Sequence, residues 1–122
     1  MIGYVTLGTN DMQTSAKFYD ALLAELGAKR FMQADTFIAW ATAPDQPSVA
    51  ISKPADGKVA TVGNGTMVAL MAENPQQVDA LYAKAIELGA TDEGAAGPRG
   101  DNFYAGYFRD LDGNKLNFFC IT

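Results

Sequence analysis

Histidine is absent from the sequence, and cysteine occurs only once, as Cys120. Without an imidazole the chain has no Ser-His or Cys-His nucleophile pair and no histidine that exchanges protons near neutral pH. Histidine metal ligands are excluded too, and one cysteine is too few for a structural zinc site. The sequence therefore rules out the commonest kinds of nucleophilic catalysis and of zinc binding.

Basic residues are few and scattered, because nine Lys and Arg stand against fourteen Asp and Glu and give a net charge of −5. Nucleic-acid binding needs clustered Lys and Arg, so we expect no nucleic-acid partner. No window reaches the ~18 apolar residues of a membrane helix, and we expect no membrane association. The N-terminus lacks the pattern of a secretory signal, and a lone cysteine forms no intrachain disulfide. These features predict a cytoplasmic protein.

The spacing of apolar residues predicts two helices among short strands. Apolar side chains recur at three- and four-residue steps from Met12 to Leu26 and from Val78 to Leu88, which is typical of amphipathic helices. Gly27 and Gly89 are natural helix ends. Alternating or apolar runs predict strands at residues 2–7, 29–33, 37–42, 48–52, 66–72, 91–93, 103–108 and 116–121. We expect residues 94–102, rich in Gly and Ala, to form a flexible loop.

The predicted elements occur in the order βαβββ twice. The pattern Ala-x-x-x-Glu-Leu-Gly-Ala stands at 21–28 and returns at 83–90, which puts Glu25 and Glu87 half a chain apart. This repeat favours an internal duplication. The alternative is a plain α+β domain with two similar helices. Under the duplication, the 122 residues form one domain of two modules, about 1–54 and 66–122, joined by a linker at 55–65.

A turn between the last two predicted strands carries the most specific motif, Asp110-Leu111-Asp112-Gly113-Asn114. Asp, Asn and Gly suit the tight turn of a β-hairpin. With the strand-to-helix start at Leu7–Asp11, the segment Gly63-Asn64-Gly65-Thr66 and the duplicated order, the chain resembles the vicinal oxygen chelate superfamily, also called the glyoxalase/bleomycin resistance/extradiol dioxygenase superfamily. The resemblance covers the whole chain, although Leu111 stands where that turn usually has proline.

The resemblance implies an α+β fold in which two paired βαβββ modules form a curved mixed sheet, a glyoxalase-like cup with its helices outside. Strand alternation then places Val5, Leu7, Val68, Leu70, Leu116 and Phe118 under the helices. The residues that the same alternation and the family pattern place inside the cup are the candidate ligand-binding residues. They are Tyr4, Thr6, Trp40, Met67, Tyr107, Arg109, Asn117 and Phe119.

Metal-dependent members of this superfamily bind a divalent ion through His and Glu on the first and last strands of each module. In this sequence the two histidine positions correspond to Tyr4 and Met67, and one glutamate position corresponds to Asn117. The fourth metal-ligand position falls among Val49, Ala50 and Ile51. Thioether and amide groups are poor ligands for a hard cation, and one phenol does not hold a metal alone. We therefore predict no metal ligands and no cofactor, with a divalent metal as the alternative.

Three functions are compatible with these features. The favoured one is a metal-free protein of the drug-sequestering or resistance type that binds a small hydrophobic or planar ligand in its cup. The second is a divalent-metal-dependent lyase, isomerase or dioxygenase of the glyoxalase type, and no catalytic residue is identified for it. The third is a non-catalytic dimerisation or protein-docking module. The resemblance also implies a homodimer. Arg109 and Lys115 would lie at the rim of the cup, where each is either a contact for an anionic ligand or a solvated charge.

Overall fold

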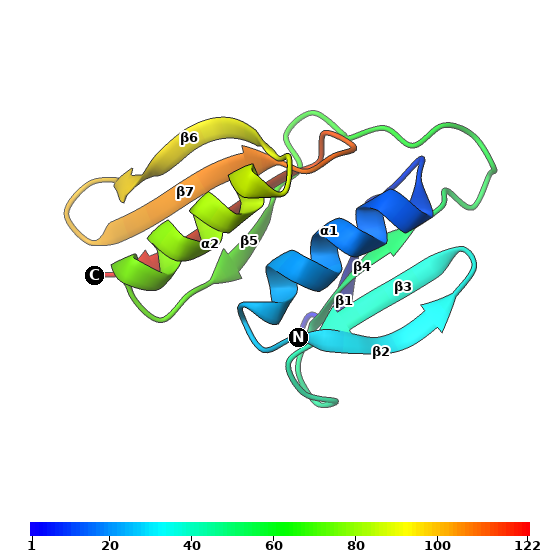
Figure 1. Ribbon diagram of the computed structural model, residues 1–122, viewed down its shortest axis with the longest axis horizontal. Helices are drawn as coiled ribbons and strands as arrows, with labels where there is room; N and C mark the ends of the chain where they lie inside the picture. The colour runs from blue at the N-terminus through cyan, green and yellow to red at the C-terminus, as the bar shows by residue number, and fades with distance from the viewer. The chain divides into compact units, whose positions relative to one another are not determined.

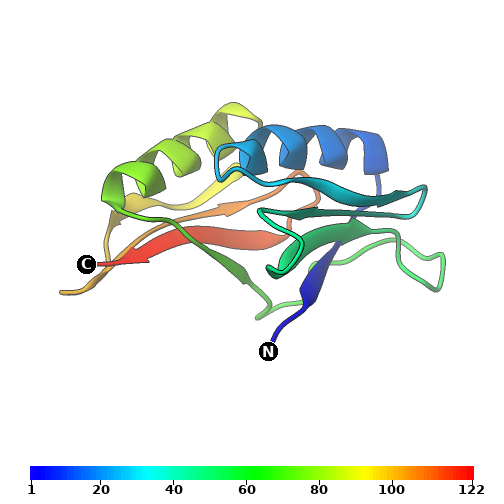
Figure 2. The same cartoon turned by 90° about the horizontal axis from the view of Figure 1, so that it is seen from below.

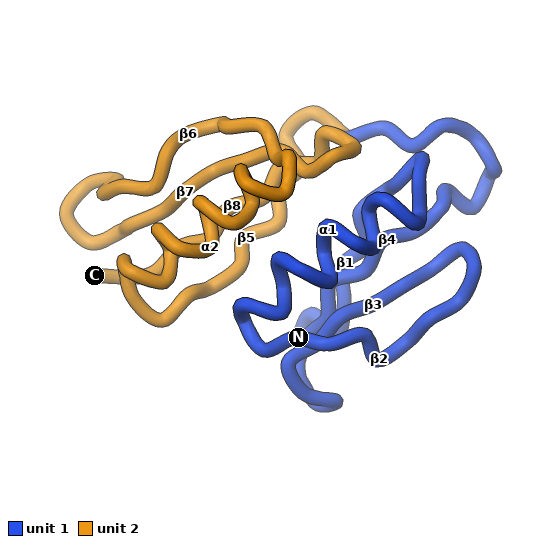
Figure 3. The backbone as a smooth tube through the Cα atoms, in the orientation of Figure 1, with its two compact units in different colours: residues 1–62 blue, residues 63–122 orange.

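The computed structural model describes residues 1–122 as two compact units, Met1–Val62 and Gly63–Thr122, which are coloured separately in Figure 3. Each unit has one helix and a four-stranded mixed sheet in the order βαβββ. The predicted α+β fold of two βαβββ modules is therefore confirmed. The division between the units falls inside segment 55–65. Neither helix is long and apolar enough to span a membrane.

Unit 1 packs one helix on one face of its sheet (Figure 1). Its elements are β1 (Tyr4–Gly8), α1 (Met12–Ala24), β2 (Lys29–Ala34), β3 (Phe37–Ala41) and β4 (Ser48–Ser52). The strand order is β1-β4-β3-β2, with β1 parallel to β4 and the other pairs antiparallel. The parallel pair requires a crossover connection, and β1 is joined to the rest of the sheet through α1.

Unit 2 repeats this arrangement, and Figure 2 shows α2 lying along one face of its sheet. Its elements are β5 (Val68–Met71), α2 (Pro75–Glu87), β6 (Thr91–Pro98), β7 (Phe103–Arg109) and β8 (Lys115–Ile121), in the order β5-β8-β7-β6. The predicted loop at residues 94–102 is wrong in its first half. Two register irregularities, between Asp92 and Gly94 and between Gly94 and Gly97, let the strand continue to Pro98.

Both helices begin and end on the same local chemistry. The side chains of Asp11 and Asn74 are N-caps and accept hydrogen bonds from the backbone N–H groups of Thr14 and Gln77. Each helix ends at a glycine with positive φ, 78° at Gly27 and 106° at Gly89. In both cases the residue after the glycine donates its backbone N–H to the carbonyl oxygen five residues earlier, which forms a Schellman motif. The repeated Glu-Leu-Gly-Ala sequence is thus a repeated helix end.

The core of each unit lies between its helix and one face of its sheet. In unit 1, Phe18, Tyr19 and Leu22 of α1 are buried, as are the strand residues Leu7 and Ile51. In unit 2, Val78 and Leu81 of α2 are fully buried, and the rings of Phe108 and Phe118 stack with centroids 5.5 Å apart. Tyr82 lies directly on Gly106, where an added Cβ would come within 2.9 Å of its ring. The side chains predicted to face the helices occupy these faces.

A polar contact ties the helix to the second strand at equivalent positions of both units. In unit 1 the carboxylate of Asp20 accepts two hydrogen bonds from Arg30, at 2.8 and 2.7 Å, and one of 2.8 Å from the indole Nε1 of buried Trp40. In unit 2 the hydroxyl of Tyr82 donates a 2.6 Å bond to Asp92. Burial and this bond raise the pKa of Tyr82 to about 12. The same site is therefore an ion pair in one unit and a phenol–carboxylate bond in the other.

Replacement of Asp20 by alanine is expected to lower the free energy of unfolding by about 2 kcal/mol, because it leaves the buried indole N–H of Trp40 and the guanidinium of Arg30 without their acceptor. Urea unfolding at pH 7 measures the loss. Glu87→Ala is the matched control, since Glu87 makes only an exposed 3.7 Å ion pair with Lys84. That pair is expected to contribute less than about 0.5 kcal/mol.

The contact between Asp20 and Arg30 also makes the free energy of unfolding depend on pH. The hydrogen bonds from Arg30 hold the pKa of Asp20 below its ordinary value of 3.8, so the stabilisation is complete above that value and is lost as the pH falls through the lowered pKa. The difference in the free energy of unfolding between wild type and Asp20→Ala should therefore be constant from pH 7 to pH 5 and become smaller near pH 3. A difference as large at pH 3 as at pH 7, or a loss no greater than that of Glu87→Ala, would contradict this account.

Candidate functional site

Each sheet has one face that its own helix does not cover, called here the helix-free face. In unit 1 the pairing of Tyr4 with Ser48 and of Thr6 with Ala50 places these side chains on that face, together with Phe37 and Ala39 of β3. Exposure agrees with this assignment, because Tyr4 is 63% exposed whereas Leu7, on the helix side of β1, is 4% exposed. The helix-free faces contain nearly all the predicted ligand-binding residues.

An apolar groove of about 130 Å³ lies on the helix-free face of unit 1. Its floor is made of small, buried residues, Ala39 and Ser48, and the rings of Tyr4 and Phe37 meet edge to face with centroids 6.0 Å apart. The other walls are Phe31 and Met32, each about half exposed. Small floor residues between aromatic walls leave room for a flat apolar group.

Phe31, Met32 and Phe37 were not found from the sequence. A β-bulge between Arg30 and Met32 shifts the register, so Arg30 stays on the helix side while Met32 pairs with Ala39. Strict alternation cannot anticipate such a shift. The alternation of Phe37 with Ala39 was the available signal for Phe37, but the face could be chosen only once the register with β4 was known.

The placement of Trp40 inside the cup is wrong. Trp40 pairs with Val49 on the helix side of the sheet, where it is 2% exposed, contacts Tyr19 and donates its indole N–H to Asp20. Its equivalent in unit 2 is Phe108, since Trp40 pairs with Arg30 and Phe108 pairs with Asp92, the strand residues that bond to the two helices. A register error of one residue transfers a side chain to the opposite face.

The helix-free face of unit 2 brings together the predicted residues of that unit. Asn117 pairs with Ala69 and Tyr107, and Lys115 pairs with Arg109. Phe119 lies further along β8, stacked on Phe103 with ring centroids 5.3 Å apart. At the other end of the face a cavity of about 340 Å³ is lined by Asn64, Gly65, Thr66, Met67, Arg109 and Lys115. This face is more polar than that of unit 1.

Two cations lie against the ring of Tyr107 on this face. The guanidinium of Arg99 and the ammonium of Lys115 lie 5.5 and 5.7 Å from the centroid of its ring. Arg99, expected in a loose loop, donates to the carbonyls of Ala95 and Gly97 and is held in place. Arg109 pairs with Glu93 at 2.8 Å, and this hydrogen bond lowers the pKa of the Glu93 carboxyl.

Asn117 is 1% exposed, and its side-chain oxygen Oδ1 has no hydrogen-bond partner. The nearby Asn114 is buried to a similar degree, but its amide donates to Asp110, whose carboxylate also accepts the N–H groups of Asp112 and Asn114. That network forms the hairpin turn, as expected for turn residues. A buried acceptor without a donor is unusual in a folded protein, and this keeps Asn117 among the candidate site residues.

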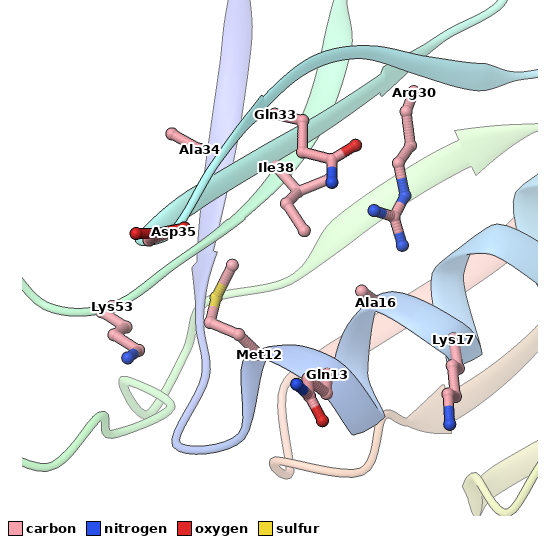
Figure 4. Close-up of a pocket in the computed structure, with 10 residues that line it drawn as sticks. All are labelled: Met12, Gln13, Ala16, Lys17, Arg30, Gln33, Ala34, Asp35, Ile38 and Lys53. Carbon is pink, nitrogen blue, oxygen red and sulfur yellow. The ribbon is translucent and has the colours of Figure 1, made fainter.

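Another cavity, of about 440 Å³, lies elsewhere in unit 1, between α1 and the hairpin of β2 and β3 (Figure 4). Met12 and Ala16 of α1 lie opposite Gln33 and Ile38 across it. The Arg30 at its edge is already paired with Asp20. No residue predicted for the site lines this cavity, and it contains no pair of groups suited to acid–base chemistry.

A family model described as the Glyoxalase/Bleomycin resistance protein/Dioxygenase superfamily matches residues 1–118. The chain belongs to this superfamily. No protein of curated function matches the sequence. Among solved structures, a glyoxalase/bleomycin resistance protein from Albidiferax ferrireducens T118 is 36% identical, with a TM-score of 0.89 and 98% of each chain covered.

Two further solved structures have the same fold at lower sequence identity. The hypothetical protein SA1046 from S. aureus is 25% identical, with a TM-score of 0.76 over 98% of this chain and 92% of that one. Lactoylglutathione lyase from Agrobacterium tumefaciens is 15% identical, with a TM-score of 0.72 over the same shares. At 15% identity the similarity shows the fold alone.

The residues at the superfamily's metal-binding positions do not fit a divalent metal. Of the three candidates for the fourth position, only Ala50 lies on a helix-free face, since its partner Thr6 does so and Val49 and Ile51 point to the helix side. The four positions thus contain a phenol, a thioether, an amide and a methyl group. The structure contains no cluster of three or more His, Cys, Asp or Glu side chains that could hold a metal ion. Such a donor set is unsuited to a hard cation.

The unpaired side-chain oxygen of Asn117 predicts an unusual effect of mutation on stability. Asn117→Leu is expected to leave the free energy of unfolding unchanged or to raise it, because it replaces a buried side chain whose oxygen has no partner by an apolar side chain of similar size. Asn114→Leu, the matched control, is expected to lower it by about 2 kcal/mol or more because it breaks the Asp110 network. Chemical denaturation of both variants measures this, and a loss at Asn117 as large as that at Asn114 would contradict a site role.

Proposed function

We propose that this protein is a metal-free, small-molecule-binding member of the glyoxalase/bleomycin resistance/dioxygenase superfamily, of the sequestering or resistance type. The groove on the helix-free face of unit 1 carries the proposal. It combines walls from Tyr4, Phe31, Met32 and Phe37 with a floor of small residues. Its ligand is a small hydrophobic or planar compound.

The size and lining of the groove support this ligand class. A cavity of about 150 Å³ is enough to hold benzene in a protein interior, and the groove has about 130 Å³. Aromatic walls offer flat surfaces for stacking, and a methionine side chain adapts to the outline of its partner. Phe31, Met32 and Tyr4 expose half or more of their surface, so a ligand covering them would remove apolar area from water.

A divalent-metal-dependent lyase, isomerase or dioxygenase is the alternative function, suggested by the superfamily as a whole. The donor set at the metal-binding positions argues against it. No side-chain pair on either helix-free face combines a nucleophile with a base, so we assign no catalytic residue.

Ligand binding is tested on protein treated with a chelator and labelled at the methionine methyl groups. Planar aromatic compounds are expected to shift the Met32 methyl resonance and raise the melting temperature. Trp40 fluorescence should stay unchanged, because Trp40 lies on the helix side. Tyr4→Ala removes one wall and should weaken binding about tenfold. Ile121→Ala, which truncates a side chain of similar exposure at the end of β8, is the control and should leave binding unchanged.

The binding proposal is contradicted if no compound in a broad planar panel shifts the Met32 methyl resonance or raises the melting temperature. Equal affinity of a compound for wild type and Tyr4→Ala would contradict it as well. Titration of the same chelated protein with nickel, zinc, manganese and iron separates the alternative. We expect no stoichiometric binding and no change in melting temperature. One ion bound per chain with a raised melting temperature would favour the metalloenzyme.

A homodimer is a second proposal, favoured by the apolar side chains exposed on the helix-free faces. Tyr4, Phe31 and Met32 of unit 1 are 52–63% exposed and line one groove, and monomeric proteins rarely leave large apolar side chains grouped in this way. Light scattering should give twice the chain mass of 13.0 kDa, and Phe31→Lys should shift the mass toward that of one chain. A single-chain mass for the wild type at high micromolar concentration would contradict this.

A further inference from the structure

We propose that the cavity between α1 and the hairpin of β2 and β3 is a separate binding site, which takes a small organic acid with a compact apolar body. The guanidinium of Arg30 and the side-chain amide of Gln33 bind the carboxylate, and the apolar body packs against Met12 and Ile38. Gln33 and Ile38 pair with each other on the helix side of the sheet of unit 1. The site is therefore on the opposite face from the groove of the proposed function.

The cavity lies where unit 1 packs less closely than unit 2. In unit 2 the ring of Tyr82 lies directly on Gly106, and Val78 of α2 is fully buried. In unit 1 Ile38 takes the place of Gly106, since each lies two residues before the strand residue that packs under the helix, and the smaller Ala16 takes the place of Val78. Helix α1 also approaches the backbone of β2 and β3 at fewer places than α2 approaches β6 and β7. Space that unit 2 fills with its own side chains is thus left open in unit 1.

The size and the apolar lining of the cavity suit a compact organic body. Its volume of about 440 Å³ lies within the range of about 300–1,000 Å³ that is usual for small-molecule sites. Figure 4 shows the side chain of Met12 on α1 directed toward Ile38 on β3, with Ala16 behind them on the helix. At about 30 Å³ for each water-sized group, this space holds roughly fifteen non-hydrogen atoms. A ligand of that size would cover these three side chains and remove apolar area from water.

The charged side chains around the cavity favour an anion. Lys17, Arg30 and Lys53 line it, and Asp35 is the one carboxylate among the lining residues, although the whole chain has a net charge of −5. Asp20 compensates the charge of Arg30, but neither lysine takes part in a salt bridge. The two lysines therefore give this part of an acidic protein a local attraction for anions.

Arg30 and Gln33 have hydrogen-bond donors left for a carboxylate. Asp20 accepts from Nε and Nη2 of Arg30, which leaves the two N–H groups of Nη1, and the side-chain amide of Gln33 makes no hydrogen bond within the chain. Figure 4 shows both side chains reaching from β2 into the space above α1. A carboxylate accepts hydrogen bonds from a guanidinium and an amide at once. The Arg30 side chain is only 30% exposed, which strengthens its attraction for an anion.

Three probes that share one apolar body test the assignment. They are adamantane-1-carboxylate, its carboxamide and adamantan-1-amine, whose cage is too thick to stack as a flat ring does. Titrations of the full chain at pH 7 follow the methyl resonance of Met12 in the cavity and that of Met32 in the groove. The carboxylate should shift Met12 and bind about tenfold more tightly than the carboxamide, as expected for hydrogen bonds to a charged group. The amine should bind least, and added salt should weaken binding of the carboxylate.

Two polar variants test the contacts to the carboxylate. Gln33→Glu puts a like charge where the carboxylate binds and should weaken the carboxylate probe about tenfold, to the level of the carboxamide. Gln76→Glu is the charge-matched control, because Gln76 is also exposed but lies on α2 outside the cavity. Arg30→Lys keeps a cation for Asp20 but removes the remaining donor nitrogen, so it should weaken the carboxylate about fivefold.

A third variant tests the space itself. Ala16→Leu places a larger side chain at the cavity wall and should weaken all three probes without lowering the melting temperature, because the added groups enter open space. Ala83→Leu, the same substitution at an exposed position of α2, should leave binding unchanged. The two polar variants decide the question even if Ala16→Leu does not fold.

Equal affinity for the carboxylate and the carboxamide would overturn the proposal, as would undiminished carboxylate binding in Gln33→Glu. The absence of any shift of the Met12 methyl resonance at millimolar carboxylate would overturn it too. A shift of Met32 without a shift of Met12 would place the probe in the groove, which would refute this site and leave the proposed function intact. A failure of one proposal is therefore distinguishable from a failure of the other.

Discussion

Each sheet of this protein is covered by a single helix, and side chains alternate between the two faces of every strand. One set of side chains therefore packs under the helix, while the other set lies on the helix-free face. Leu7, Ile51, Phe108 and Phe118 belong to the first set, and Tyr4, Ala39, Tyr107 and Asn117 to the second. The packing side chains and the candidate ligand-binding side chains thus lie on opposite faces of the same strands.

The two units keep the same helix ends while the chemistry between helix and sheet differs. Both helices close on a glycine in a Schellman motif, because the geometry needs a positive φ. The contact to the second strand is free of such a constraint and needs only a donor and an acceptor. It is Asp20 with Arg30 in one unit and Tyr82 with Asp92 in the other. This pattern is what an old duplication is expected to leave.

The helix-free faces have diverged further. That of unit 1 is aromatic and methionine-rich around small floor residues, while that of unit 2 is cationic around Tyr107 and contains a buried amide oxygen with no donor. The superfamily's metal positions have residues that do not fit a divalent metal. The two faces therefore offer different surfaces, an apolar one in unit 1 and a cationic one in unit 2.

Local sequence patterns are enough to predict much of the fold of this protein. Helix periodicity, the repeated Glu-Leu-Gly-Ala and the Asp-x-Asp-Gly-Asn turn predict the βαβββ order twice. Strand alternation puts Tyr4 and Asn117 on the side of the strand away from the helix, where the pairing registers also place them, because these short strands have no bulge. Tertiary structure decided what depends on pairing register. The bulge near Met32 brings Phe31 and Met32 to the groove, the pairing of β3 with β4 turns Trp40 toward Asp20, and irregular pairing extends β6 through a glycine-rich segment. Register is set by contacts between strands distant in sequence, so no single stretch of residues encodes it.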